Sequence, residues 1–172
     1  MEILHTASFE TPAGTMLAAS SSIGLAYLEL PHASGHGFGG FLRRIGARAT
    51  EGWAPNRPAV EQVSEYLAGK RREFDLHLDL RGTEFQRLVW DQLCRIPYGT
   101  SCAYQDVARA IGRPSAVRAV GTANGANPLP LVVPCHRVVA TGGKLGGYGG
   151  GLDLKRRLLA MESAEPGVGS LL

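Results

Sequence analysis

The sequence of 172 residues contains only three cysteines, and its uninterrupted apolar runs are a few residues long. A membrane-spanning helix needs roughly 20 consecutive apolar residues, so we expect no membrane segment. The cysteines at positions 94, 102 and 135 show neither the paired spacing of a zinc site nor the even count of a disulfide framework. They therefore favour a reducing compartment and no metal site. The N-terminus lacks the basic and apolar regions of a secretory signal, and we expect a cytoplasmic protein.

Charged residues are also sparse, at 19% of the chain, and the formal net charge is +3. The positive excess lies in the second half, because residues 82–172 carry 10 Lys or Arg against 6 Asp or Glu, whereas residues 1–81 carry 8 against 9. This asymmetry favours an anionic partner, such as nucleic acid, for the second half.

The first 80 residues have the pattern of a small α+β unit. Three apolar runs between turn signals predict strands over residues 3–10, 15–20 and 25–30. A glycine-rich loop over 33–40 precedes helical spacing over 41–49 and 58–68. Alternation of leucine with polar residues over 75–80 predicts a further half-buried strand. We expect a hinge at Arg81-Gly82, which would divide the chain into domains of residues 1–80 and 81–172.

The second half begins with helical signals. Thr83 is placed to cap a helix that runs to Leu93. Two short helices follow, over residues 104–111 and 114–123, joined by a tight glycine-containing turn. Such a pair outlines a helix-turn-helix, although short helix pairs also occur in domains that bind no DNA.

The second short helix carries mostly small residues. Ala119, Thr122 and Ala123 would let another backbone, such as that of DNA, approach closely, or would serve core packing. Arg118 is the single long cation on this surface. It is either a solvated or phosphate-pairing arginine, or a side chain that inserts into a duplex and unstacks a base.

The run Pro-Cys-His-Arg at residues 134–137 is the strongest indication of chemistry. A thiol next to an imidazole and a guanidinium can be held as the thiolate, the form that attacks electrophiles. Cys135 is therefore a candidate nucleophile. The signature of a papain-like protease is absent around it, and an inert core cysteine is the alternative reading.

His136 is the candidate base. Adjacent side chains seldom hydrogen-bond directly, so we expect His136 to reach Cys135 through a water. A carboxylate must then keep His136 basic. Glu162 is the best placed by location, and Asp153 and Asp106 remain alternatives.

A glycine-rich segment follows the cysteine. Residues 141–151 contain seven glycines and one aromatic residue, Tyr148. The segment is either a flexible linker or a loop whose backbone amides approach a planar or anionic group. It is not a Walker or dinucleotide fingerprint. Asp153 then caps a final helix, with Glu162 near the end of that helix.

These motifs together resemble the O6-alkylguanine-DNA alkyltransferases. The similarity begins with residues 134–139 and extends, in the family's order, to residues 85–90, 96–100, 104–105, 118–121, 127–128, 146–148 and 149–152. It is close over residues 80–163 and loose before them. The resemblance implies an α+β fold, with a small N-terminal α/β domain of ribonuclease-H-like type and a mostly helical domain bearing a winged-helix-like helix-turn-helix.

The resemblance also implies a function. Members flip an alkylated guanine out of double-stranded DNA from the minor groove and transfer the alkyl group irreversibly to their own cysteine. Each molecule acts once, without a cofactor or a membrane, as a monomer that repairs DNA by direct reversal of damage. Activity on O4-alkylthymine and cooperative assembly on DNA stay open.

Roles for individual residues follow from the same resemblance. Cys135 would accept the alkyl group, His136 would be the base acting through a water, and Glu162 would orient His136. Asn127 would brace the active-site turn, and Tyr104 would donate a proton or hydrogen bond toward N3 of guanine. The DNA-binding residues would be Arg118, Ala119, Thr122 and Ala123. The pocket would be lined by Pro130, Val138, Tyr148, Gly149 and Gly150.

The chain departs from the family's pattern in places. Gly149 and Ala103 stand where serine is frequent, and residues 1–80 contain no Cys/His set that corresponds to the structural zinc of some members. Two other functions are considered. A non-catalytic alkyltransferase-like protein would bind damaged DNA but lacks the acceptor cysteine, and a helix-turn-helix regulator would prefer one operator sequence.

Overall fold

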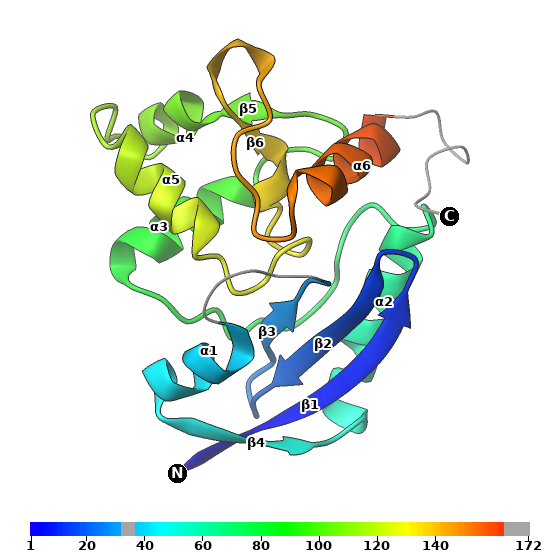
Figure 1. Cartoon of the computed structure of the whole chain (residues 1–172). Coiled ribbons are helices and arrows are strands. Elements are labelled where there is room, and N and C mark those ends of the chain that lie inside the picture. Colours follow the sequence, from blue (N-terminus) through cyan, green and yellow to red (C-terminus); the bar gives the residue numbers. More distant parts are fainter. Residues whose placement is uncertain (32–36, 164–172) are drawn as a thin grey trace.

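The computed structural model describes residues 1–31 and 37–163. A four-stranded sheet with two helices forms the N-terminal half, and a mainly helical C-terminal half packs above it (Figure 1). The expected α+β class is therefore confirmed. Within the described ranges, no helix combines the length and apolar character needed to cross a membrane.

The sheet has the strand order β3-β2-β1-β4. Its strands are β1 (Glu2–Thr11), β2 (Gly14–Ser20), β3 (Leu25–Glu29) and β4 (Ala47–Glu51). The first three are antiparallel neighbours, as the alternating pattern predicts, whereas β4 runs parallel to β1. The tight turn between β1 and β2 requires Gly14, which has φ +128°, and a Cβ there would lie 2.8 Å from Cβ of Pro31.

The prediction for the segment after β3 is wrong in part. Helix α1 (Gly37–Ile45) starts four residues before the expected helix, and the expected helical end forms strand β4. Phe41 explains this placement, because it packs in a small core with Leu4 of β1 and anchors α1 on the sheet. Gly46 takes φ +68° and turns the chain from helix into strand. Residues 33–36 of the expected loop lie outside the described ranges.

The strand expected over residues 75–80 does not form. Only one bridge is present, between Leu78 and Leu25, and the rest of this segment has no regular structure. It connects helix α2 (Arg57–Leu67), which the sequence predicts within one residue, to the C-terminal half. The leucines at alternate positions are half-buried against the main core instead of pairing in the sheet.

Among its described residues, the C-terminal half contains four α-helices and a small parallel pair of strands. These elements are α3 (Glu84–Leu93), β5 (Cys102–Ala103), α4 (Tyr104–Ala110), α5 (Val117–Gly125), β6 (Val138–Val139) and α6 (Leu152–Ser163). Thr83 caps α3 in a reciprocal capping box with Gln86, as expected. Helix α5 begins after the expected start at Pro114, whose carbonyl accepts a hydrogen bond from Gln105 Nε2 at 3.0 Å in the turn.

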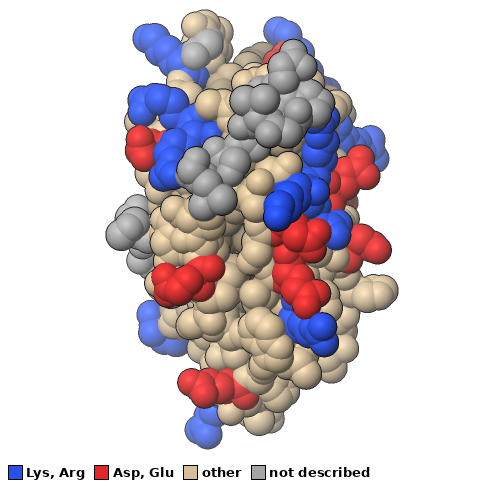
Figure 2. All heavy atoms as spheres, turned by 90° about the vertical axis from the view of Figure 1, so that its right-hand side faces the viewer, with Lys and Arg blue, Asp and Glu red and all other residues tan. Residues whose placement is uncertain are grey.

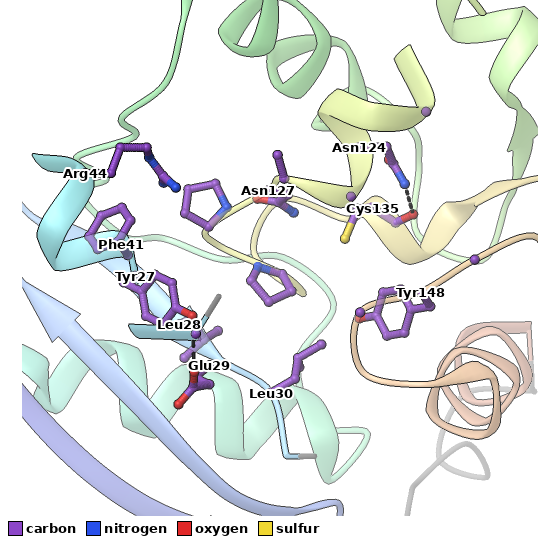
Figure 3. A pocket seen from close by; sticks show the side chains of 18 of the residues that line it. Tyr27, Leu28, Glu29, Leu30, Phe41, Arg44, Asn124, Asn127, Cys135 and Tyr148 are labelled. Carbon is purple, nitrogen blue, oxygen red and sulfur yellow. Dashed lines mark hydrogen bonds between the residues drawn. The ribbon is translucent and has the colours of Figure 1, made fainter. Parts of the chain in front are cut away.

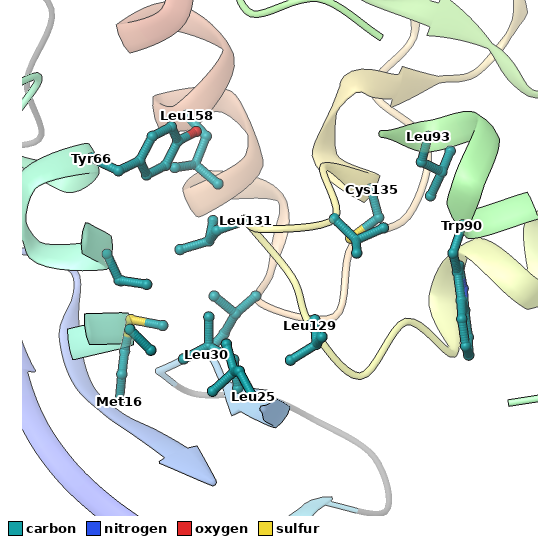
Figure 4. Packing of buried hydrophobic residues seen from close by; sticks show 14 of the residues in the cluster. Met16, Leu25, Leu30, Tyr66, Trp90, Leu93, Leu129, Leu131, Cys135 and Leu158 are labelled. Atoms are coloured by element: carbon teal, nitrogen blue, oxygen red, sulfur yellow. The ribbon is translucent and has the colours of Figure 1, made fainter. Parts of the chain in front are cut away.

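A single hydrophobic core joins the two halves. Figure 4 shows Met16, Leu25 and Leu30 of the sheet region meeting Leu129 and Leu131 from the segment before the cysteine. Burial of this apolar surface holds the sheet and the helices together. The candidate site lies at this junction.

The surface charge is mixed. Figure 2 shows the face on the right-hand side of Figure 1, where positive side chains are frequent in the upper part, negative ones gather in the middle, and the lower part carries both signs. The upper part belongs to the C-terminal half, which agrees with the charge asymmetry of the sequence.

Candidate active site

Residues 131–133, an apolar run that favours a strand before Cys135, do not form one. They form a tight turn, and Cys135 begins a short 3-10 helix, η2 (Cys135–Arg137). Asn127 holds this turn on two sides, because its Nδ2 donates to the carbonyl of Val133 at 2.8 Å and its Oδ1 accepts from the amide of Leu129 at 2.9 Å. Asn127 therefore lies where the resemblance expects a brace.

Leu131 has an unusual backbone conformation in the same turn. Its φ is +74°, and it is the one non-glycine residue with positive φ in the described part of the chain. A left-handed conformation costs roughly 1–2 kcal/mol in a residue with a side chain. Burial of the Leu131 side chain in the core and the bond from the amide of Val133 to the carbonyl of Leu129 at 2.8 Å stabilise it. The strained turn delivers Cys135 to the wall of a cavity.

The cavity has a volume of about 460 Å³ and lies between the two halves of the chain. Cys135 points into it between Asn127 and Tyr148 in Figure 3, and Tyr27, Leu30 and Phe41 of the N-terminal half face it from the other side. The C-terminal residues of the lining include Tyr104, Asn127, Pro130, Cys135, Tyr148 and Gly149. A mostly apolar cavity of this size with a few polar groups suits a ligand as large as a purine base.

Two residues that the sequence places in the pocket do not line this cavity. Val138 is fully buried, and its carbonyl accepts a hydrogen bond from Lys155 Nζ at 2.7 Å. Gly150 packs against Leu30, so a Cβ there would lie 2.8 Å from Leu30 Cδ1. Gly150 therefore lies behind Leu30 and Tyr148, which line the cavity.

His136 and Glu162 form a buried pair next to the cavity. His136 Nε2 lies 2.8 Å from Glu162 Oε2, and both side chains are fully buried. Neither sequence alternative reaches His136. Asp106 accepts a hydrogen bond from the amide of Ala103, and Asp153 lies exposed in the first turn of α6, not at its cap.

Three residues of the network were missed by sequence reasoning. Arg137 Nε donates to Glu162 Oε1 at 2.8 Å, and its Nη2 donates to Oε2 at 3.0 Å. Tyr66 of α2 donates to Oε2 at 2.5 Å. Lys155 of α6 is fully buried and donates to the carbonyls of Val138 and Gly147. No local pattern identifies them, because an arginine beside a histidine, a tyrosine among apolar residues and a lysine in a helix all have ordinary explanations.

These contacts set the charge states of the pair. Burial raises the pKa of Glu162, but hydrogen bonds from His136, Arg137 and Tyr66 outweigh it and lower that pKa to about 2. Burial lowers the pKa of His136, which Glu162 offsets only in part. At neutral pH Glu162 is therefore ionised and His136 is neutral. An ionised carboxylate only accepts hydrogen bonds, so the imidazole proton lies on Nε2 and Nδ1 keeps its lone pair.

Nδ1 of His136 is buried and has no hydrogen-bond partner among the residues described. A neutral imidazole nitrogen in this state can accept a proton, and it belongs to the residue next to Cys135. This geometry suits a base that acts on the thiol through a bridging water.

The environment of Cys135 favours the protonated thiol in the resting protein. Burial raises the pKa of Cys135 to about 11, and a hydrogen bond from Asn127 and the charge of Lys155 offset this only in part. Arg137 gives no help, since its guanidinium is bound to Glu162. Because this pKa lies above the ordinary value of a thiol, Cys135 needs a base at the moment of reaction.

Helix α5 presents an exposed face. Arg118, Ala119 and Thr122 are exposed on it, as expected. Ala123 is buried, and its carbonyl accepts a hydrogen bond from Trp90 Nε1 at 2.8 Å. This corrects the expectation that Ala123 faces DNA, because the helical turn directs its side chain into the core.

Tyr104 connects α5 to the glycine-rich segment. Its ring lies 3.9 Å from the position of a Cβ at Gly121, and its hydroxyl lies 3.2 Å from that of a Cβ at Gly146. Gly146 has φ +71°, so both backbone conformation and space require glycine there. The close approach leaves Tyr104 half-buried on the cavity wall.

Known proteins are similar to this chain over nearly its whole length. Residues 84–164 match the family described as 6-O-methylguanine DNA methyltransferase, DNA binding domain. A methylated-DNA–protein-cysteine methyltransferase from Mycobacterium bovis is 40% identical over 166 residues, 94% of each chain. The protein of that name from Mycolicibacterium paratuberculosis is 57% identical over 115 residues, 64% of this chain and 70% of the relative.

Solved structures show the same similarity. The crystal structure of Mycobacterium tuberculosis OGT in complex with DNA matches with a TM-score of 0.80 and 40% identity, over 92% of both chains. The O6-methylguanine-DNA methyltransferase of Pyrococcus kodakaraensis matches with a TM-score of 0.60 and 26% identity, over 94% of this chain and 99% of the other. Sequence and structure agree, and the chain belongs to the methylated-DNA–protein-cysteine methyltransferase family.

Proposed function

We propose that this protein repairs DNA by direct reversal, taking the alkyl group from O6 of an alkylated guanine onto Sγ of Cys135. The observation that carries the proposal is the position of Cys135 on a purine-sized cavity beside the buried His136–Glu162 pair. The family membership of the chain supports the same reaction.

The reaction needs one proton transfer and one displacement. Nδ1 of His136 takes the thiol proton of Cys135 through a water. The sulfur then forms a bond to the alkyl carbon while the bond from that carbon to O6 breaks. The electron pair of the broken bond stays on guanine, whose N1 takes a proton from water, while protonated His136 releases its proton to water. Cys135 keeps the alkyl group as a thioether. Because a thioether resists hydrolysis, each molecule acts once.

Other residues of the cavity assist this step. Tyr104 donates toward N3 of the flipped base and compensates the negative charge that develops there. Burial raises the pKa of Tyr104, so its hydroxyl keeps the proton it must donate. Pro130 and Tyr148 flank the alkyl group, and the amide of Gly149 faces the base. Asn127 keeps Cys135 at the cavity wall through the turn.

DNA binds to the C-terminal half. The exposed face of α5, with Arg118, Ala119 and Thr122, enters the minor groove, and Arg118 fills the gap that the flipped base leaves. We assign residues 81–172 to DNA binding and transfer and residues 1–80 to a supporting domain. One chain supplies the cavity and the network, which supports action as a monomer. Transfer requires a free thiol, which favours a reducing compartment such as the cytoplasm.

The non-catalytic alternative is not favoured. A protein that only binds damaged DNA has no use for a thiol on the cavity wall or for a base beside it. Both are present at Cys135 and His136.

Label transfer tests the proposal. The protein is incubated with duplex DNA carrying O6-methylguanine with an isotopically labelled methyl group, and peptides are analysed by mass. The Cys135 peptide should gain one labelled methyl group, in a single turnover. Cys135→Ala should gain none and still bind DNA, whereas Cys94→Ser, which removes an exposed thiol, should react normally. An unmodified Cys135 peptide after full exposure would reject the function.

A further inference from the structure

The N-terminal half contributes a side chain to the buried network. Tyr66 lies near the C-terminal end of α2 and is fully buried. Its hydroxyl donates to Glu162 Oε2 at 2.5 Å and lies 3.3 Å from His136 Nε2. These partners are 96 and 70 residues away in the chain, so the contact depends on the packing of the two halves.

Charge fixes the direction of these bonds. Burial, followed by the charge of Glu162, raises the pKa of Tyr66 well above its usual value, so the hydroxyl keeps its proton. Glu162 is ionised and can only accept. Tyr66 therefore donates to Glu162, and its oxygen lone pairs face the Nε2–H of His136. Both contacts favour the tautomer that leaves Nδ1 free.

The ring of Tyr66 is held firmly. Its centroid lies 5.4 Å from that of Phe74 and 6.3 Å from that of Tyr98, the latter edge-on. A hydroxyl on a ring held in this way has a fixed position relative to Glu162. The bond is thus part of the arrangement of the site before any substrate binds.

We propose that Tyr66 is a positioning residue of the alkyl transfer, which fixes the carboxylate of Glu162 and the tautomer of His136. This inference rests on the proposed function and extends it. The N-terminal half then supplies part of the proton relay and is more than a support for the DNA-binding half.

The removal of the hydroxyl has a defined electrostatic effect. In Tyr66→Phe, Glu162 loses one donor and becomes more basic, so it stabilises protonated His136 more strongly and raises its pKa. The other charged or titratable groups around the pair are unchanged; they are Lys155 of α6, Arg137 and Cys135 of η2, and the nearby Tyr98 and Tyr148. We expect the pH at which transfer falls to half to move upward by about 0.5–1 unit.

The test compares the protein with Tyr66→Phe and the control Tyr98→Phe. Tyr98 packs on Tyr66, but within the described ranges its hydroxyl makes no hydrogen bond. Single-turnover transfer from an O6-methylguanine duplex is measured against pH, and the pKa of His136 is measured by NMR. The pH midpoint of transfer and the pKa of His136 should both shift upward in Tyr66→Phe. Neither should shift in Tyr98→Phe.

A second variant keeps the test independent of folding. Incorporation of 3-fluorotyrosine at position 66 retains the ring and strengthens hydrogen-bond donation to Glu162. Glu162 then becomes less basic, so the pH midpoint of transfer and the pKa of His136 should both shift downward. Unchanged values in both Tyr66 variants would overturn the proposal, even if transfer slowed. If the unaltered protein transfers no alkyl group, the proposed function fails, while the NMR titration of His136 still decides the role of Tyr66.

Discussion

His136 Nε2 and Glu162 Oε2 lie 2.8 Å apart with both side chains fully buried, although 26 residues separate them in the chain. The pair combines an ionised carboxylate with a neutral imidazole, because the donors around Glu162 hold its charge and burial keeps His136 unprotonated. A neutral imidazole can take a proton from the thiol. A His136 that is already protonated cannot act as a base.

The rate of alkyl transfer should therefore depend on pH through His136. The pKa of this residue lies below the ordinary 6.5, so the single-turnover rate should be level between about pH 7 and 9 and fall as the pH drops through the lower value. If the rate of transfer from free O6-benzylguanine falls at the same pH, the fall does not come from weaker DNA binding. A rate that already declines between pH 8 and 7 would contradict a neutral His136.

The free energy of unfolding should also decrease at acid pH. The pKa of Glu162 is about 2 in the folded chain and 4.5 in its ordinary state, so this group stabilises the fold above pH 4.5, and the stabilisation is lost as the pH falls from 4.5 to 2. The lowered pKa of His136 acts in the same direction below pH 6.5, since the unfolded chain binds that proton more readily.

Glu162→Gln isolates the contribution of the carboxylate. At pH 7 the variant should lose about 3–5 kcal/mol in the free energy of unfolding, because Arg137 and His136 keep buried donors without the charge that they bind. Urea denaturation at pH 7 and pH 3 would measure the difference, which should shrink at the lower pH. An equal loss at both values would assign the effect to packing.

Arg118→Ala should slow transfer on duplex DNA at least tenfold and leave the reaction with free O6-benzylguanine nearly unchanged. Arg118 is exposed on α5, and its proposed task is to occupy the stack after the base has flipped, a step that a free base does not need. Arg156→Ala removes an exposed arginine from α6 and serves as the matched charge control. Equal slowing on both substrates would remove the role of Arg118 in flipping.

The parts of the site that the sequence predicts are those with local signals. Cys135 and His136 are adjacent, and Glu162 follows at the end of a helix whose spacing is readable. Spacing alone leaves Asp106 and Asp153 as alternatives to Glu162, and the choice of Glu162 rests on the family resemblance. In the structure Glu162 is the one of the three that lies against His136. Asp106 accepts a hydrogen bond from the amide of Ala103 in β5, and Asp153 is exposed.

The remaining parts depend on contacts between distant segments. Tyr66 is one of several apolar-face residues of α2, and only the position of Glu162 gives its hydroxyl a function. The start of α1 was missed for a similar reason. Glycines at 37, 39 and 40 favour a loop locally, but the burial of Phe41 against the sheet outweighs their low helix propensity.

Lys155 is a residue for which a helical pattern predicts exposure, and yet its side chain is fully buried. Its Nζ donates to the carbonyls of Val138 at 2.7 Å and Gly147 at 3.1 Å, so it ties the segment after η2 to the glycine-rich loop. Its charge also lowers the pKa of Cys135, against the larger effect of burial.

Lys155→Met should therefore affect the loop and the thiol together. The buried carbonyl of Val138 and the partly buried carbonyl of Gly147 lose their donor, which should cost about 1–3 kcal/mol in the free energy of unfolding. Amide hydrogen exchange should become faster over residues 141–151, and the pKa of Cys135 should rise above its value of about 11, with slower transfer as the result. Arg156→Met, which changes an exposed residue of α6, provides the control. Faster exchange without any change in the thiol pKa would confine Lys155 to a structural role in the loop.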